Sequence, residues 1–183
     1  MKKLRVFESI SIDGYFADSA GDNAWAHAGR QDAEFAAWVA GNASPGGELL
    51  FGRKTYQMME AFWPTELAAA QMPDVARGMN AAIKHVASRT IHPSWTNARL
   101  LDGDLVPAVR QLKASDGRGM TVLGSGSLVA QLDAAGLVDE YQFVILPIAL
   151  GAGRTVFAQR RDLRLIEQRA FSCGNVVVTY AAA

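Results

Sequence analysis

The sequence contains few of the residues that bind metals or form disulfides. It has one cysteine, Cys173, and three histidines, His27, His85 and His92, that lie far apart along the chain. A single cysteine cannot form an internal disulfide, and the histidines lack the spacing of a metal centre. We therefore expect no metal site and no redox metal chemistry.

The chain also lacks net charge and long apolar runs. Lys plus Arg and Asp plus Glu both number 18, so no broad basic surface is expected for nucleic acid or for a membrane. No apolar run approaches membrane-spanning length, and the charged N-terminal segment is not followed by the apolar stretch of a secretory signal. These absences predict a soluble, cytoplasmic protein whose partner is a small molecule.

Half of the residues are hydrophobic, which is enough for residues 1–183 to form one α/β domain. Strand-like and helix-like segments alternate first, and strands follow near the end. Residues 141–150 suit a central strand in which Pro147 makes a bulge or bend. Residues 163–171 and 176–180 suit a hairpin. The predicted fold is a mixed, mostly parallel central sheet flanked by helices, with an antiparallel C-terminal hairpin.

Residues 120–132, MTVLGSGSLVAQL, have the pattern of a strand, a tight turn and a helix. Ser125 or Ser127 can cap the helix, and the two glycines let backbone N–H groups approach a ligand closely. Two interpretations are open. The turn is a phosphate cradle at a helix N-terminus, or it only connects the strand to the helix.

Two further predicted strands, at residues 48–52 and 83–87, are each followed by hydroxyl and basic side chains. These are Arg53, Lys54 and Thr55 after the first strand, and Ser88, Arg89 and Thr90 after the second. Such groups suit a phosphate, although solvated surface charges are the alternative. His85 is expected to face the outside of its strand.

Three acidic residues are candidates for chemistry. Asp13 follows the first predicted strand, and it is either a turn residue or a carboxylate at the strand end where α/β sheets bind ligands. Asp32 and Glu34 begin a predicted helix, where they complement the helix dipole or point into a pocket. Residues 17–29 are expected to form a loop over a site.

Six segments together resemble the dihydrofolate reductase-like superfamily, and within it the C-terminal (reductase) domain family of the riboflavin-biosynthesis protein RibD. They are SIDGYFAD, LLFGRKTY, HVASRT, TVLGSGSLVAQL, LVDEYQFVILPIALGAG and GNVVVTY. They occur in this order from near the first residue to near the last. The resemblance implies a mixed sheet of about eight strands flanked by helices.

The resemblance also implies NADPH as hydride donor. The residues that match the family's cofactor motifs are Gly52, Arg53 and Thr55 at the nucleotide phosphates, Ser88 and Arg89 beside the adenosine 2′-phosphate, and Gly124, Ser125, Gly126, Ser127 and Leu128 at the pyrophosphate. The arginines favour NADPH over NADH, because a 2′-phosphate requires a charged partner that a ribose hydroxyl does not.

For catalysis, the segment SIDG resembles the family's S-x-D-G motif on the substrate side, which makes Asp13 the candidate proton donor or substrate-orienting group. Its pKa would have to be raised by burial. Asp32 or Glu34 is the competing choice, since true dihydrofolate reductases carry an acid on the first long helix.

The implied function is that of an NADPH-dependent oxidoreductase similar to 5-amino-6-(5-phosphoribosylamino)uracil reductase of riboflavin biosynthesis. Lys54 and Arg154 are candidates for a substrate phosphate. The alternatives are reduction of dihydrofolate or another small molecule, and a non-catalytic NADPH-binding module. The absence of a Pro-Trp pair after the first strand counts against dihydrofolate. The sequence also has no cytidine-deaminase-like zinc domain, so the bifunctional riboflavin enzyme is not expected. A homodimer is plausible by the same resemblance.

Overall fold

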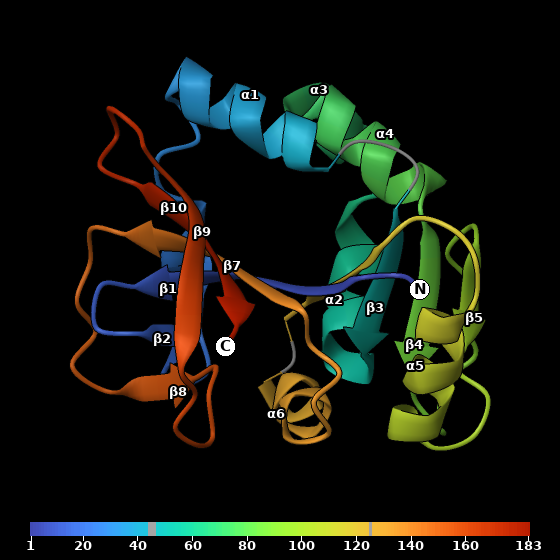
Figure 1. The fold of residues 1–183 in the computed structure, drawn as a ribbon. Coiled ribbons are helices and arrows are strands. Elements are labelled where there is room, and N and C mark those ends of the chain that lie inside the picture. The colour runs from blue at the N-terminus through green and yellow to red at the C-terminus, as the bar shows by residue number, and fades with distance from the viewer. Residues whose placement is uncertain (44–46, 125) are drawn as a thin grey trace.

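The computed structural model describes residues 1–43, 47–124 and 126–183. Its centre is an eight-stranded sheet in the order β5-β4-β3-β6-β1-β7-β10-β9 (Figure 1). The strands are β1 (Leu4–Ser11), β3 (Glu48–Gly52), β4 (Ile83–Ala87), β5 (Ala98–Leu100), β6 (Met120–Leu123), β7 (Glu140–Leu146), β9 (Leu163–Ala170) and β10 (Val176–Ala182).

Most neighbouring strands in this sheet run parallel. β1 pairs in parallel with β6 and β7, while β3 pairs in parallel with β4 and β6, and β4 with β5. β10 is antiparallel to both β7 and β9, so the chain ends in a hairpin. The predicted fold class, a mixed and mostly parallel sheet with an antiparallel C-terminal hairpin, is confirmed.

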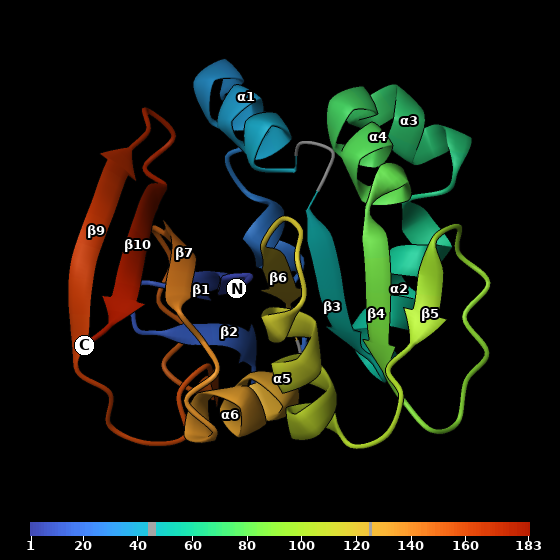
Figure 2. The ribbon, with the colours of Figure 1, turned by 45° about the vertical axis from the view of Figure 1, so that its right-hand side comes forward.

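Helices cover both faces of the sheet (Figure 2). They are α1 (Ala33–Asn42), α2 (Arg53–Phe62), α3 (Glu66–Gln71), α4 (Pro73–Ala81), α5 (Leu105–Ala114) and α6 (Gly126–Ala134). Strand β3 shows the division, because side chains alternate between the faces of a strand. Leu50 joins the core formed with α5 and α6, whereas Phe51 joins the core formed with α2 and α4. Throughout the described ranges, each helix is too short or too polar to cross a membrane.

A second sheet of two antiparallel strands lies beside the first. β2 (Tyr15–Asp18) pairs with β8 (Gly153–Thr155), and a short 3-10 helix, η1 (Ala24–His27), follows β2. The prediction of a loop over residues 17–29 is therefore wrong at residues 17–18, which belong to β2, and at residues 24–27, which form η1. Its alternation was too short to reveal a strand whose partner is so distant in the sequence.

Pro147 ends its strand instead of bending it. β7 stops at Leu146, and the N–H of Ile148 turns back to donate to the carbonyl of Leu146 at 2.8 Å. The prediction that the strand continues to residue 150 is wrong, because proline has no N–H to offer the ladder.

His85 is buried, and the prediction that it faces outward is wrong. Its side chain is 2% exposed and its Nε2 lies 2.7 Å from Oε2 of Glu48, whose other carboxylate oxygen accepts a hydrogen bond from Lys2 Nζ. Burial lowers the pKa of His85. Burial raises the pKa of Glu48, but the hydrogen bonds from Lys2 and His85 outweigh it and leave that pKa below its ordinary value. A buried ion pair thus joins the N-terminus to β3.

Replacing the Glu48 carboxylate should make the chain easier to unfold. Glu48→Gln leaves the buried ammonium of Lys2 without its charge partner, and we expect a loss of about 3 kcal/mol in the free energy of unfolding. Urea denaturation measures it. The matched control is Glu66→Gln on the exposed start of α3, which should change stability by about 0.5 kcal/mol or less. Equal losses in the two variants would refute the role of the pair.

Candidate active site

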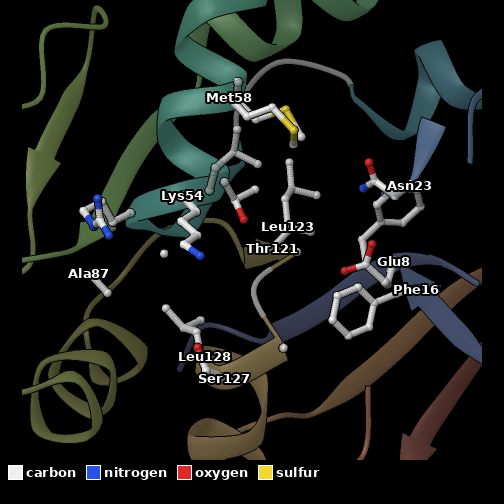
Figure 3. Close-up of a pocket in the computed structure, with 18 of the residues that line it drawn as sticks. Glu8, Phe16, Asn23, Lys54, Met58, Ala87, Thr121, Leu123, Ser127 and Leu128 are labelled. Carbon is white, nitrogen blue, oxygen red and sulfur yellow. The ribbon is translucent and has the colours of Figure 1, made fainter. Parts of the chain in front are cut away.

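A pocket of about 1200 Å³ lies at the carboxyl ends of β3, β4 and β6 (Figure 3). This edge is where open α/β sheets bind ligands, because the strand-to-helix connections there leave backbone N–H groups free. Its volume exceeds the roughly 300–1,000 Å³ of a usual small-molecule site. The pocket is therefore large enough for two ligands side by side.

The first junction that lines the pocket joins β3 to α2. Gly52 is the buried N-cap of α2 and offers no capping side chain, so the first N–H groups of the helix are available to a ligand. Arg53, Lys54 and Thr55 follow and also line the pocket. The two basic side chains are exposed and thus free to reach an anion.

The second junction joins β6 to α6. Gly124 has φ +61°, and a Cβ there would lie 3.2 Å from Oγ1 of Thr55. A Cβ on Gly126 would lie 2.9 Å from the ring of Phe16. Glycine is therefore favoured at both positions, because the positive φ of Gly124 strains other residues and a side chain at either position would press on Thr55 or Phe16. Ser127 is exposed at the start of α6 and Leu128 is buried beneath it, while the predicted Ser125 lies outside the described residues.

The third junction follows β4. Ala87, Ser88 and Arg89 line the pocket there. The guanidinium of Arg89 pairs with the carboxylate of Asp104, which precedes α5, and both side chains are exposed. An exposed pair of this kind is weak, so Arg89 can turn toward an anionic ligand at little cost.

Positively charged side chains gather at the pocket, although the net charge of the whole chain is zero. Among its described lining residues, five are Lys or Arg and two are acidic, whereas the whole chain has equal numbers of both signs. The basic ones are Arg30, Arg53, Lys54, Arg89 and Arg154. Such a lining favours an anionic ligand.

Asp13 lies outside the set of residues that line this pocket. Its exposed carboxylate accepts hydrogen bonds from the Ser11 hydroxyl at 2.6 Å and from the Gly151 N–H at 2.7 Å. The bond from Ser11 and then that from Gly151 lower the pKa of Asp13. A proton donor needs the opposite shift, so the geometry favours the turn interpretation, in which Asp13 ties the end of β1 to the segment after β7.

The two competing acids are also outside the pocket lining. Asp32 caps α1 by accepting from the Phe35 N–H at 2.8 Å, and it accepts a further hydrogen bond from the Ser172 hydroxyl. These two bonds, that of Ser172 first, lower its pKa. Glu34 pairs with Arg169 of β9 at 2.6 Å. Asp32 and Glu34 thus lie at the start of α1, where they complement the helix dipole, and neither points into the pocket.

Glu8 of β1 is one of the two acids that line the pocket, the other being the Asp104 paired with Arg89, and no sequence motif pointed to it. It occupies the row of β1 that also holds Leu4 and Val6, which are fully buried in the apolar core, and Ile10, which is partly buried against it. Burial raises the pKa of its carboxyl to about 8. The available signal was a charged residue inside an alternating apolar row, which usually marks a functional position.

The family model of the RibD C-terminal domain matches residues 2–179. The chain belongs to this family. The YyaP protein of Bacillus subtilis (strain 168) is 28% identical over 135 residues, which are 72% of this chain and 72% of that protein. Membership of this family indicates a reductase of the riboflavin-pathway type.

Two solved structures share the fold of this family member. A Shewanella sp. PV-4 protein assigned by inference to riboflavin biosynthesis superposes with a TM-score of 0.70 at 22% identity, covering 99% of each chain. A pyrimidine reductase-like protein from Corynebacterium diphtheriae superposes with a TM-score of 0.60 at 12% identity, covering 100% of this chain and 92% of that one. At these identities the likeness establishes the fold.

Removing the charge of Asp13 should loosen the loop that it holds. In Asp13→Asn we expect faster hydrogen exchange at the amides of Leu150 and Gly151 and a lower melting temperature, because both N–H groups donate to this carboxylate. In the wild type the same loss should appear as pH falls through the lowered pKa of Asp13. Asp116→Asn, on an exposed bend, is the control, and unchanged exchange in Asp13→Asn would contradict this role.

Proposed function

We propose that this protein is an NADPH-dependent reductase that transfers hydride to a small heterocyclic substrate. One observation carries the proposal: three junctions, after β3, β4 and β6, open on a single pocket with a basic lining. A dinucleotide has phosphates at separate positions, and three adjacent anion sites match that pattern.

The residues at these junctions fit NADPH. The positive φ of Gly124 and the tight space beside Thr55 favour glycine there, and a backbone without a side chain lets a pyrophosphate approach closely. The N-terminus of α2 adds N–H groups without a capping side chain, and α2 and α6 both direct the positive end of a helix dipole toward the pocket. Bound there, NADPH would supply the hydride, while the protein binds and orients both reactants and excludes water.

The predicted preference for NADPH over NADH rests on the arginines. Figure 3 shows Ala87, at the end of β4, on the opposite side of the pocket from Glu8. Ser88 and Arg89 follow Ala87 in the chain and line the same pocket. A guanidinium and a hydroxyl there are the groups that a 2′-phosphate monoester requires.

For the substrate, we propose a phosphorylated heterocycle of the type of 5-amino-6-(5-phosphoribosylamino)uracil. Family membership supports this class, and Lys54 and Arg154 line the same pocket and are exposed. Dihydrofolate, another small molecule, or no substrate at all are the outcomes that a direct assay separates. We also propose, from the family resemblance alone, that the protein is a homodimer, and from the sequence that it is cytoplasmic.

Titration with NADPH and NADH, followed by oxidation assays with each of the two named substrates, tests this function. We expect the wild type to bind NADPH more tightly than NADH and to oxidise it only with a substrate present. In Arg89→Ala the affinity for NADPH should fall by about tenfold with that for NADH unchanged, since the loss of one charge-assisted contact costs about 1.5 kcal/mol.

The matched control is Arg110→Ala on the exposed side of α5, which should bind both nucleotides as the wild type does. Equal loss of both nucleotides in Arg89→Ala would remove the 2′-phosphate role. Failure of the wild type to bind either nucleotide would overturn the cofactor assignment, and binding without turnover would leave a nucleotide-binding module.

A further inference from the structure

We infer that Glu8 is the acid of this site and that it gives the substrate the proton that accompanies hydride transfer. The inference rests on the proposed function. It extends that function to a new residue, because the family resemblance pointed to Asp13 and not to Glu8 of β1. Of the four acids considered, Glu8 is the one whose side chain lines the pocket.

The position of Glu8 places its carboxyl next to the proposed cofactor cradle. A Cβ on Gly124 would lie 3.8 Å from Oε2 of Glu8 and 3.2 Å from Oγ1 of Thr55. Figure 3 shows Glu8 with Phe16 and Asn23 on one side of the pocket, and Lys54 on the other. The carboxyl thus borders the cradle at Gly124 on the side of the pocket away from Lys54, and the reacting end of a cofactor would lie on that side.

The surroundings of Glu8 keep it protonated near neutral pH. It is mostly buried, and burial raises its pKa to about 8, opposed only in part by a hydrogen bond from the backbone of Ser9. The charged and titratable groups lining the pocket around it are Arg53 and Lys54 of α2, His27 of η1, Arg30 before α1, Arg154 of β8, and the Arg89–Asp104 pair. Phosphates bound to the basic groups would neutralise their pull on the carboxylate, so a bound cofactor favours the protonated form.

The step balances as a reduction of a C=N or C=O bond. The hydride of the reduced nicotinamide forms a C–H bond with the electrophilic carbon, and the π electron pair moves to the nitrogen or oxygen. That atom takes the proton of Glu8, which becomes a carboxylate and regains a proton from solvent. The nicotinamide is oxidised and the substrate is reduced by two electrons.

This role also restricts the substrate. A protonated carboxyl donates one hydrogen bond, so the atom next to the reduced carbon must have a lone pair that accepts it, as an imine or ring nitrogen or a carbonyl oxygen has. The ring of Phe16 beside Glu8 offers an apolar face to a flat heterocycle. The substrate class is therefore a heterocyclic or open-chain imine or carbonyl compound.

The test compares wild type, Glu8→Gln, Glu8→Asp and the exposed control Glu66→Gln with NADPH and the two substrates named above. In Glu8→Gln we expect kcat to fall by about a hundredfold or more, while the affinity for NADPH stays within about twofold because no phosphate contact is lost. Wild-type kcat/KM, which reports the free enzyme, should fall as pH rises through about 8. Glu8→Asp should restore part of the activity and its pH dependence.

A second readout needs no turnover. Because the pKa of Glu8 is raised in the folded chain, wild-type stability should fall as pH rises from about 4.5, the ordinary carboxyl value, to about 8. Glu8→Gln lacks this titration, so its melting temperature should rise relative to the wild type across the same range. Carboxyl NMR of ¹³C-labelled glutamate locates the titration of Glu8 directly.

The outcomes separate the two proposals. Wild-type turnover with an unchanged kcat and pH profile in Glu8→Gln would overturn the role of Glu8 and leave the reductase standing. A Glu8 carboxyl that titrates at its ordinary value would overturn it as well. A wild type that reduces neither substrate would overturn the reductase, and the role of Glu8 with it.

Discussion

Parallel pairing of β3, β4 and β6 is the constraint on which the rest of the structure depends. Parallel strands end at the same edge of a sheet, so the segments that follow them meet there although they are far apart in the sequence. The N-termini of α2 and α6 consequently open on one space, with Gly124 against Thr55. Without this pairing, the basic and hydroxyl residues would be ordinary surface groups.

Electrostatics then divide the pocket. The basic side chains gather where free helix N–H groups already favour anions, whereas Glu8 lies in the apolar row of β1 and keeps its proton. Solvent stabilises the charged form of the exposed Arg53 and Lys54, and burial favours the neutral form of Glu8. The proposed anion binding and proton donation need these charge states. The buried pair of Glu48 with Lys2 and His85 lies in the same sheet and has a structural role, joining the N-terminus to β3.

Much of this arrangement could be predicted from the sequence. The β3 strand at residues 48–52, the start of α2 at Arg53 and the hairpin of β9 and β10 follow from local patterns of apolar residues and turns. The β2–β8 pair could not be predicted, because short strands with distant partners carry no strong local signal. The role of Glu8 was not predicted and the prediction for His85 was wrong for one reason: a polar residue in a strand shows its environment only once its neighbours from other elements are in place.

The crystal structure of this chain with NADPH tests the central claim most directly. We expect the pyrophosphate between the N-termini of α2 and α6 beside Gly124, the 2′-phosphate against Arg89, and the nicotinamide ring on the side of the pocket that holds Glu8. A nucleotide bound elsewhere on the sheet, or one whose nicotinamide points away from Glu8, would contradict it.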